Sequence, residues 1–315
     1  MLDRTDRHFR FFFRQISEGT LLFTEMVVDR ALIHGDPERL LAHDPAERPL
    51  VLQLASADPK TAAKAAKKAL PYDFFELNLN VGCPSEKSQR AGFGAILMRQ
   101  PDRVAAIAQA IAEATGRMPS LKHRLGLDDD REEESLFGFV EQLAKAGVTT
   151  FIVHARKALL SLDTRKNRAV PPLRHDLVHR LKAAFPELTI ITNGGIQTTD
   201  EALSHLARLD GVMVGRAAWE DPFRFADVDE RIFGLKRRPT RAEVARRMAE
   251  YLAAELMRGT PGSAVLRPLF NLYKGVPGAR AWRRVLGGGP PSPETLLKAL
   301  EAAEQAPSGK VGAWG

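Results

Sequence analysis

Seven short runs of apolar, largely β-branched residues alternate with longer helical patterns, and this alternation limits the possible fold more than any other feature. Strands that alternate with helices form βαβ units in one parallel sheet. A chain of 315 residues is long enough for one barrel of such units plus a small appendage. The predicted strands are Leu21–Met26, Leu50–Leu54, Phe74–Asn80, Ser120–Leu125, Thr149–His154, Thr189–Asn193 and Gly211–Gly215.

A helix is predicted over Asp6–Ser17, ahead of the first strand, although a TIM (β/α)8 barrel begins with a strand. We therefore expect an α/β TIM barrel whose first strand is missing from this chain, and a natural start upstream of Met1. Beyond Gly234 the strands stop, and Thr240–Leu256 and Pro293–Glu304 are predicted to be amphipathic helices. The predicted domains are a barrel over 1–234, a helical domain over 235–305 and a tail over 306–315.

Composition and charge exclude some classes of protein. No apolar run approaches the roughly 20 residues of a membrane helix, and the polar start lacks a signal-peptide core. A single cysteine excludes an internal disulfide and fits a reducing, cytoplasmic location. The net charge of +7 suits a polyanionic partner such as nucleic acid, or is merely a basic surface.

Polar residues end most of the predicted strands, and in a parallel barrel these C-terminal ends carry the chemistry. Two consecutive strands end in glycines, at Asn193-Gly194-Gly195 and at Gly215-Arg216. Backbone N–H groups at glycines can approach an anion closely, and the loops after the last two strands are the usual phosphate site of this fold. We therefore expect phosphate binding here; the alternative is that the glycines only form tight turns.

Lys122 lies within an apolar strand, so it must project into the barrel mouth or pair with an acid. A cation there could stabilise negative charge on a reduced flavin. The alternatives are a structural ion pair and a Schiff-base lysine of the aldolase type.

Cys83 follows a strand end and is flanked by Gly82 and Pro84, which favours an accessible thiol over a buried apolar residue. A thiol is mostly protonated near neutrality and can donate a proton. It could equally be a nucleophile, with His154 as its base. Spacing does not choose between these roles.

Two basic clusters are candidates for contacts with nucleic acid phosphates, and a solvated basic face is the simpler alternative. The first cluster follows the His154 strand and contains Arg165, Lys166 and Arg168. The second contains Lys274, Arg280, Arg283 and Arg284, with Trp282 as an aromatic component.

The segment Glu76–Ser85 (Glu-Leu-Asn-Leu-Asn-Val-Gly-Cys-Pro-Ser) resembles the signature of tRNA-dihydrouridine synthases. Other segments match in the family's order and cover nearly the whole barrel, so the ordered set is specific although each motif alone is weak. The C-terminal matches resemble the bacterial subfamily that acts on U20 and U20a of the tRNA D-loop. The further matching segments are Thr24–Met26, Gln53-Leu54, Lys122–Gly126, His154–Arg156, Asn167-Arg168, Pro171–Leu173, Asn193–Ile196, Gly211–Arg216 and Gly278–Arg284.

The resemblance implies an FMN-dependent enzyme that reduces uridine in tRNA with NADPH. It implies that Gln53 and Lys122 contact the flavin ring, that Cys83 is the proton donor and that Asn80 touches the target nucleotide. Met1 aligns with the methionine of the family's first strand end and joins the flavin set. The remaining flavin contacts would be His154, Asn193, Gly194, Gly195, Gly215 and Arg216, and the tRNA contacts would be Arg165, Arg168, Arg280 and Arg283. The loop near Arg165 is one residue shorter than in relatives.

Three other functions compete with this prediction. A flavin barrel acting on a free pyrimidine would share the phosphate site and the acid but would not need the C-terminal arginines. A cofactor-free aldolase using Lys122 would be colourless, and a non-catalytic RNA-binding protein would not oxidise NADPH. We predict the tRNA-modifying enzyme, as a monomer without metal or membrane attachment.

Overall fold

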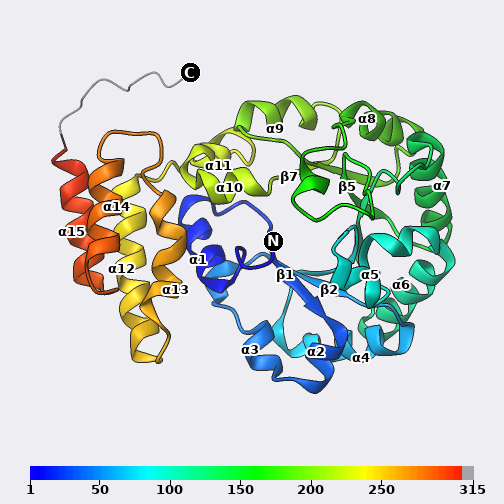
Figure 1. The fold of residues 1–315 in the computed structure, drawn as a ribbon, viewed down its shortest axis with the longest axis horizontal. Coiled ribbons are helices and arrows are strands. Elements are labelled where there is room, and N and C mark those ends of the chain that lie inside the picture. Colours follow the sequence, from blue (N-terminus) through cyan, green and yellow to red (C-terminus); the bar gives the residue numbers. More distant parts are fainter. Residues whose placement is uncertain (307–315) are drawn as a thin grey trace. The chain divides into compact units, whose positions relative to one another are not determined.

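The computed structural model describes residues 1–306 (Figure 1), so residues 307–315 of the predicted tail lie outside it. Contacts divide the chain into two compact units. The first unit holds Met1–Leu2 and Leu21–Gly215, and the second holds Asp3–Thr20 and the chain from Arg216 onward. This division falls earlier than the predicted boundary after residue 234 and assigns the N-terminal helix to the second unit.

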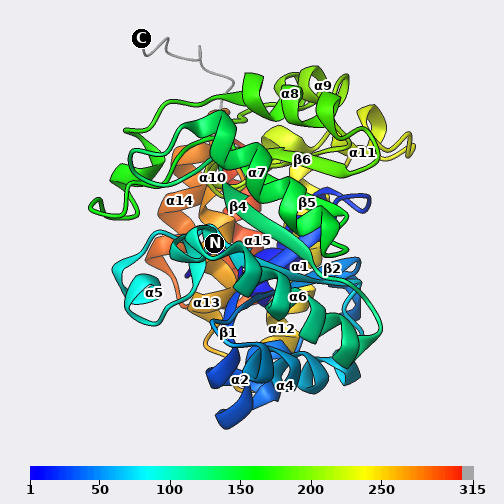
Figure 2. The same ribbon diagram turned by 90° about the vertical axis from the view of Figure 1, so that its right-hand side faces the viewer.

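The strands of the first unit form a seven-stranded sheet in chain order, and each neighbouring pair is parallel. In Figures 1 and 2 the helices of this unit lie around the curled sheet, as in a TIM-type barrel. Within the described residues β1 and β7 are its two edges, so the predicted barrel lacking one strand is confirmed. The strands are β1 (Leu22–Val28), β2 (Leu50–Ala55), β3 (Glu76–Val81), β4 (Ser120–Arg124), β5 (Thr150–His154), β6 (Thr189–Asn193) and β7 (Gly211–Met213).

Side chains cap the starts of several helices of the first unit. Asp58 accepts a hydrogen bond from the Thr61 N–H at the start of α4, and Thr198 does the same for α9. Four of the five alanines of α4 are buried and recur at helical spacing, which lets the helix pack closely; they are Ala62, Ala65, Ala66 and Ala69. The helices are α2 (Asp29–His34), α3 (Pro37–Leu41), α4 (Pro59–Ala69), α5 (Glu86–Arg90), α6 (Pro101–Thr115), α7 (Glu132–Lys145), α8 (His175–Ala184) and α9 (Thr199–Leu206).

All regular secondary structure in the described residues of the second unit is helical. Aromatic packing explains why the N-terminal helix α1 belongs to it. The Phe9 ring lies 5.3 Å from the Trp219 ring, and Phe11 stacks on Tyr251 at 3.9 Å. The Tyr251 hydroxyl is also 2.9 Å from His8 Nδ1. The helices are α1 (Arg7–Ile16), α10 (Arg216–Glu220), α11 (Val228–Arg231), α12 (Arg241–Met257), α13 (Gly262–Leu266), α14 (Ala279–Gly288) and α15 (Pro293–Glu304).

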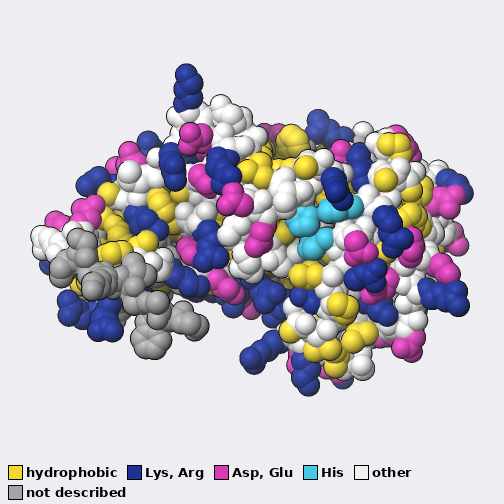
Figure 3. Space-filling model, turned by 90° about the horizontal axis from the view of Figure 1, so that it is seen from above, with side chains coloured by type: hydrophobic (Ala, Val, Ile, Leu, Met, Phe, Trp, Pro, Cys, Tyr) yellow, Lys and Arg dark blue, Asp and Glu magenta, His cyan; other side chains and the backbone are white. Residues whose placement is uncertain are grey.

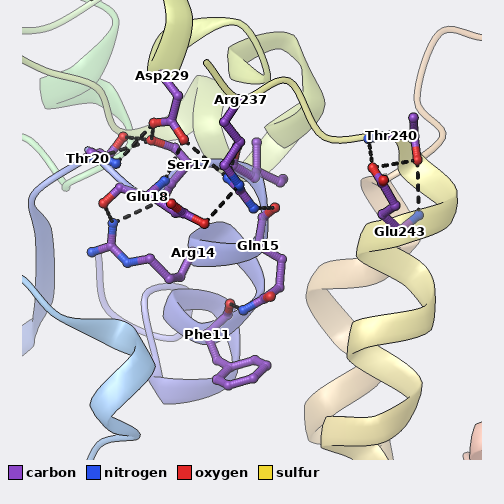
Figure 4. A network of polar contacts seen from close by, with 12 residues as sticks. Phe11, Arg14, Gln15, Ser17, Glu18, Thr20, Asp229, Arg237, Thr240 and Glu243 are labelled. Atoms are coloured by element: carbon purple, nitrogen blue, oxygen red, sulfur yellow. Dashed lines mark hydrogen bonds and ion pairs between the residues drawn. The ribbon is translucent and has the colours of Figure 1, made fainter. Parts of the chain in front are cut away.

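A fully buried carboxylate, Asp229, organises the turn after α1 (Figure 4). It accepts hydrogen bonds from Ser17 Oγ at 2.6 Å, from the N–H groups of Glu18 and Gly19 at 2.7 and 3.0 Å, and from the Arg237 guanidinium at 3.2 Å. Burial alone would raise the pKa of Asp229, but these hydrogen bonds together hold the pKa below its ordinary value. The charged form of Asp229 therefore stabilises the second unit.

Replacing Asp229 with alanine is expected to lower the free energy of unfolding by about 3 kcal/mol at neutral pH, because it leaves several buried donors unpaired. Since the folded pKa is depressed, this contribution is present above about pH 4 and is lost as the pH falls below it. Urea denaturation at pH 7 and below pH 4 measures both effects. The neighbouring exposed Glu230, replaced with alanine, is the control, and an equal loss in both variants would contradict the prediction.

Candidate active site

A chain of amide side chains crosses the carboxyl-terminal half of β2 and β3. Gln53 Nε2 donates to Asn78 Oδ1 at 2.8 Å, and Asn80 Nδ2 donates to Gln53 Oε1 at 2.8 Å. Asn78 Nδ2 continues the chain to Ser120 Oγ on β4 at 2.9 Å. Gln53 and Asn78 are paired in register, as are Asn80 and Lys122, so these side chains meet across neighbouring strands.

The loop that carries Cys83 is held by Asn80, whose Oδ1 accepts from the N–H groups of Gly82 at 3.1 Å and Cys83 at 2.9 Å. The Cys83 thiol is free and half-buried. Ser88 Oγ donates to its sulfur at 3.2 Å, and Ser85 Oγ lies 3.5 Å from the same atom. Hydroxyls, rather than an imidazole, are thus the hydrogen-bond partners of the thiol.

Lys122 projects from β4 to the end of β6, where its Nζ donates to Asn193 Oδ1 at 3.2 Å. Asn193 Nδ2 in turn donates to the Met213 carbonyl at 2.7 Å. The pKa of Lys122 is lowered to about 8, mainly by burial and also by nearby Arg124, while the Cys83 thiol acts in the opposite direction. Its partner is an amide oxygen and not a carboxylate, so the structure favours the mouth-facing lysine over a structural ion pair.

The two glycine turns follow adjacent strands, because Asn193 on β6 pairs in register with Met213 on β7. Gly194 and Gly195 have φ values of +120° and +72°, which favour glycine. A Cβ on Gly194 would lie 2.8 Å from His154 Cδ2, and a Cβ on Gly215 would lie 3.6 Å from Met1 Sδ. The turns, His154 and Met1 therefore gather at the carboxyl ends of the strands, while Arg216, the next residue after Gly215, belongs to the second unit.

Arg124, given no separate role in the sequence analysis, links the Cys83 loop to the loop after β5. Its buried guanidinium donates to the carbonyls of Gly82 at 3.2 Å, Lys157 at 3.0 Å and Asn167 at 3.2 Å. The buried Asn167 amide also donates to the carbonyls of Leu159 and Leu162 at 2.7 and 2.8 Å. These hydrogen bonds order the loop on which Arg165 and Arg168 are exposed. A single sign of this role of Arg124 is present in the sequence, namely an arginine at the end of a strand.

The arginines of the second basic cluster lie on α14, where Arg280 and Arg283 are exposed. The expectation that Trp282 adds an aromatic contact to this cluster is wrong. Trp282 is completely buried, its ring lies 4.7 Å from the Tyr273 ring, and its Nε1 donates to the Leu269 carbonyl at 2.8 Å. The basic side chains of the cluster, Lys274 included, remain as candidate nucleic acid contacts.

The curled parallel sheet and the polar residues at its strand ends define a protein of the (β/α)-barrel class. Solved structures support this fold: morphinone reductase in complex with tetrahydroNAD matches with a TM-score of 0.50 at 12% identity, covering 77% of this chain and 86% of that chain. The model of the dihydrouridine synthase family matches residues 1–306, and the chain belongs to that family.

Curated relatives are similar over almost their whole length. The tRNA-dihydrouridine(20/20a) synthase of Synechocystis is 45% identical over 308 residues, covering 96% of this chain and 92% of the relative. The protein of the same name from Vibrio cholerae is 42% identical, with coverages of 96% and 93%. No helix within residues 1–306 is sufficiently long and apolar to traverse a bilayer.

Proposed function

We propose that the chain is a tRNA-dihydrouridine(20/20a) synthase, an oxidoreductase that reduces the C5–C6 bond of uridine in the tRNA D-loop. Family membership and the names of relatives 45% and 42% identical to it support this activity. The structural observation that carries the proposal is one edge of the sheet where a half-buried thiol, a lysine and two glycine turns meet.

FMN fits this edge as the cofactor. The close approach permitted at Gly194, which a Cβ would block, suits a phosphate group, and the N–H groups there would hold it. His154, Asn193, Gly195, Gly215 and Arg216 complete the proposed phosphate and ribityl contacts. Gln53, Lys122 and Met1 would contact the ring, and Lys122 would offset negative charge on it. Bound FMN would supply the hydride for C6 of uracil, taken from NADPH.

Cys83 would supply the proton for C5 of uracil. Its thiol has serine hydroxyls as partners and no imidazole base among its hydrogen bonds, which favours an acid over an activated nucleophile. Asn80 would touch the target nucleotide while it positions the Cys83 N–H. The uridine must leave the D-loop stack to reach these groups, at a cost of a few kcal/mol.

The exposed arginines would bind the tRNA backbone. We propose Arg165 and Arg168 on the loop after β5 and Arg280 and Arg283 on α14, since guanidinium groups pair well with phosphate. A cytoplasmic location, which the single cysteine favours, a monomeric state and the use of NADPH rather than NADH are further parts of the proposal.

Replacing both Arg280 and Arg283 with alanine is expected to weaken tRNA binding and to flatten its salt dependence. Each phosphate contact contributes roughly 0.7 to 0.9 to the slope of log affinity against log salt, so two lost contacts reduce the slope by about 1.5. Binding isotherms between 50 and 200 mM salt measure this slope. Arg131→Ala, at an exposed arginine outside both clusters, is the control; an unchanged slope in the double variant would remove these contacts.

The decisive test of function offers the purified protein unmodified tRNA transcripts, NADPH and FMN, and maps dihydrouridine by mass spectrometry. We expect dihydrouridine at positions 20 and 20a, and its loss in transcripts with cytidine there. Free uridine and free uracil are the parallel substrates. Reduction of a free pyrimidine without reduction of tRNA would replace the proposal by a small-molecule pyrimidine reductase of the same barrel type.

A further inference from the structure

Three histidines cluster on α8 and α9 of the first unit. The His205 ring lies 4.4 Å from the His175 ring, and His179 Nε2 lies 3.1 Å from His205 Nδ1. Figure 3 shows a group of histidine side chains on the face viewed from above, the side on which α8 and α9 lie in Figure 1. The proposed reaction uses none of these residues.

His175 connects this cluster to the glycine turn after β6. Its Nε2 lies 2.9 Å from the Gly194 carbonyl oxygen, and its Nδ1 lies 2.8 Å from Oγ1 of Thr192, which is fully buried. A carbonyl oxygen only accepts, so Nε2 carries the proton and donates to Gly194. In the neutral ring Nδ1 then accepts from the Thr192 hydroxyl, and both bonds together fix the ring.

The hydrogen bond to Gly194 also fixes the direction of the next N–H group. In a planar trans peptide the carbonyl and the N–H point in opposite directions. Holding the Gly194 carbonyl toward His175 therefore directs the Gly195 N–H away from α8. Among the described residues no protein group accepts a hydrogen bond from this N–H, which leaves it for an anion.

We propose that His175 is a positioning residue for the phosphate of the flavin, acting through the Gly194–Gly195 peptide. This inference rests on the proposed function, because it takes FMN as the ligand of the glycine turn. His205 packs against the His175 ring, and His179 contacts His205, so His179 lies one contact further from the turn.

The groups around the cluster keep the ring neutral. Burial lowers the pKa of His175, and His205, His179 and Arg156 add to this effect while the Gly194 carbonyl opposes it. The remaining charged neighbours face the outer two histidines: Asp176 and Arg208 at His179, and Glu201 at His205.

Two nearly isosteric substitutions separate the two hydrogen bonds of His175. His175→Gln places an amide N–H near the position of Nε2 and retains a donor for the Gly194 carbonyl. His175→Asn reaches only the position of Nδ1, so it retains the Thr192 bond and loses the Gly194 bond. His179→Leu changes the cluster without touching the turn and is the matched control.

The test compares the affinities of the apoprotein for FMN and for riboflavin, which lacks the phosphate, by quenching of flavin fluorescence. In His175→Asn the dissociation constant of FMN is expected to rise about tenfold, as for one lost hydrogen bond, with that of riboflavin unchanged. His175→Gln and His179→Leu should keep the wild-type ratio of the two constants.

Two results overturn different parts of the argument. An equal change for FMN and riboflavin in His175→Asn, or no change for either, would give His175 a merely structural role and leave the proposed function intact. Equal affinity of the wild-type protein for both flavins would overturn the phosphate turn itself, and with it the proposed cofactor site.

Discussion

Replacing Cys83 with alanine is expected to slow dihydrouridine formation by roughly 10²- to 10⁴-fold, the usual contribution of a placed general acid. The fold and FMN binding should remain, because the backbone bonds of residue 83 do not use its side chain. Its N–H donates to Asn80 Oδ1 at 2.9 Å, and its carbonyl accepts from the Ala95 N–H at 2.9 Å. The substitution therefore removes only the thiol that would donate the proton to C5 of the uracil.

Single-turnover reactions with unmodified tRNA measure this effect directly. Ser88→Ala is the control, since it removes a hydroxyl that contacts the Cys83 sulfur at 3.2 Å but retains the thiol. We expect its rate to stay far above that of Cys83→Ala. If Cys83→Ala turns over at the wild-type rate with FMN bound, another group delivers the proton.

Replacing Lys122 with methionine is expected to lower turnover by roughly 10²- to 10³-fold, since removing one preorganised electrostatic contact has effects of this size. The same substitution should stabilise the apoprotein by roughly 2 kcal/mol at neutral pH, because a partly buried charge is removed and methionine fills a similar volume. Activity and stability are thus expected to change in opposite directions at one position.

The pH dependence of stability follows from the lowered pKa of Lys122. The unfolded chain keeps the proton on this lysine up to about pH 10.4, whereas the folded protein loses it near pH 8. Between these values the unfolded state binds more protons, so the free energy of unfolding contributed by Lys122 rises with pH and reaches its full value above the unfolded pKa.

Urea denaturation of the two apoproteins at pH 7, 9 and 10.5 checks this linkage. The stability difference between Lys122→Met and the wild type should shrink as the pH rises through this window. A difference that stays constant from pH 7 to pH 10.5 would show that Lys122 keeps its charge in the folded protein.

Local patterns predicted most elements because their signals lie within a few residues. Strand β6 (Thr189–Asn193) and helix α15 (Pro293–Glu304) coincide with the predicted ranges. Thr240 and Glu243 form a capping box that starts α12 one residue after the predicted beginning. The glycine turns and Cys83 were found because their positions after strand ends follow from the fold.

Contacts between distant segments could not be predicted from one sequence. The burial of Trp282 depends on its packing against Tyr273, and a tryptophan among arginines gives no sign of this. The hydrogen bond between His175 and Gly194 joins residues 19 positions apart. It requires the first residue of α8 to lie beside the end of β6 in space. For the same reason the helix over Asp6–Ser17 was predicted, but the aromatic partners of its phenylalanines were not.

The membership of α1 in the second unit has a consequence for how the chain is made. During synthesis this helix emerges before the sheet, whereas the α12 residues on which it packs emerge only after β1 to β7 have been translated. Until then the phenylalanines of α1, of which Phe9, Phe12 and Phe13 are buried in the folded protein, lack their packing partners. The helical half is therefore completed last, and a fragment starting at Arg216 would lack part of its own interior.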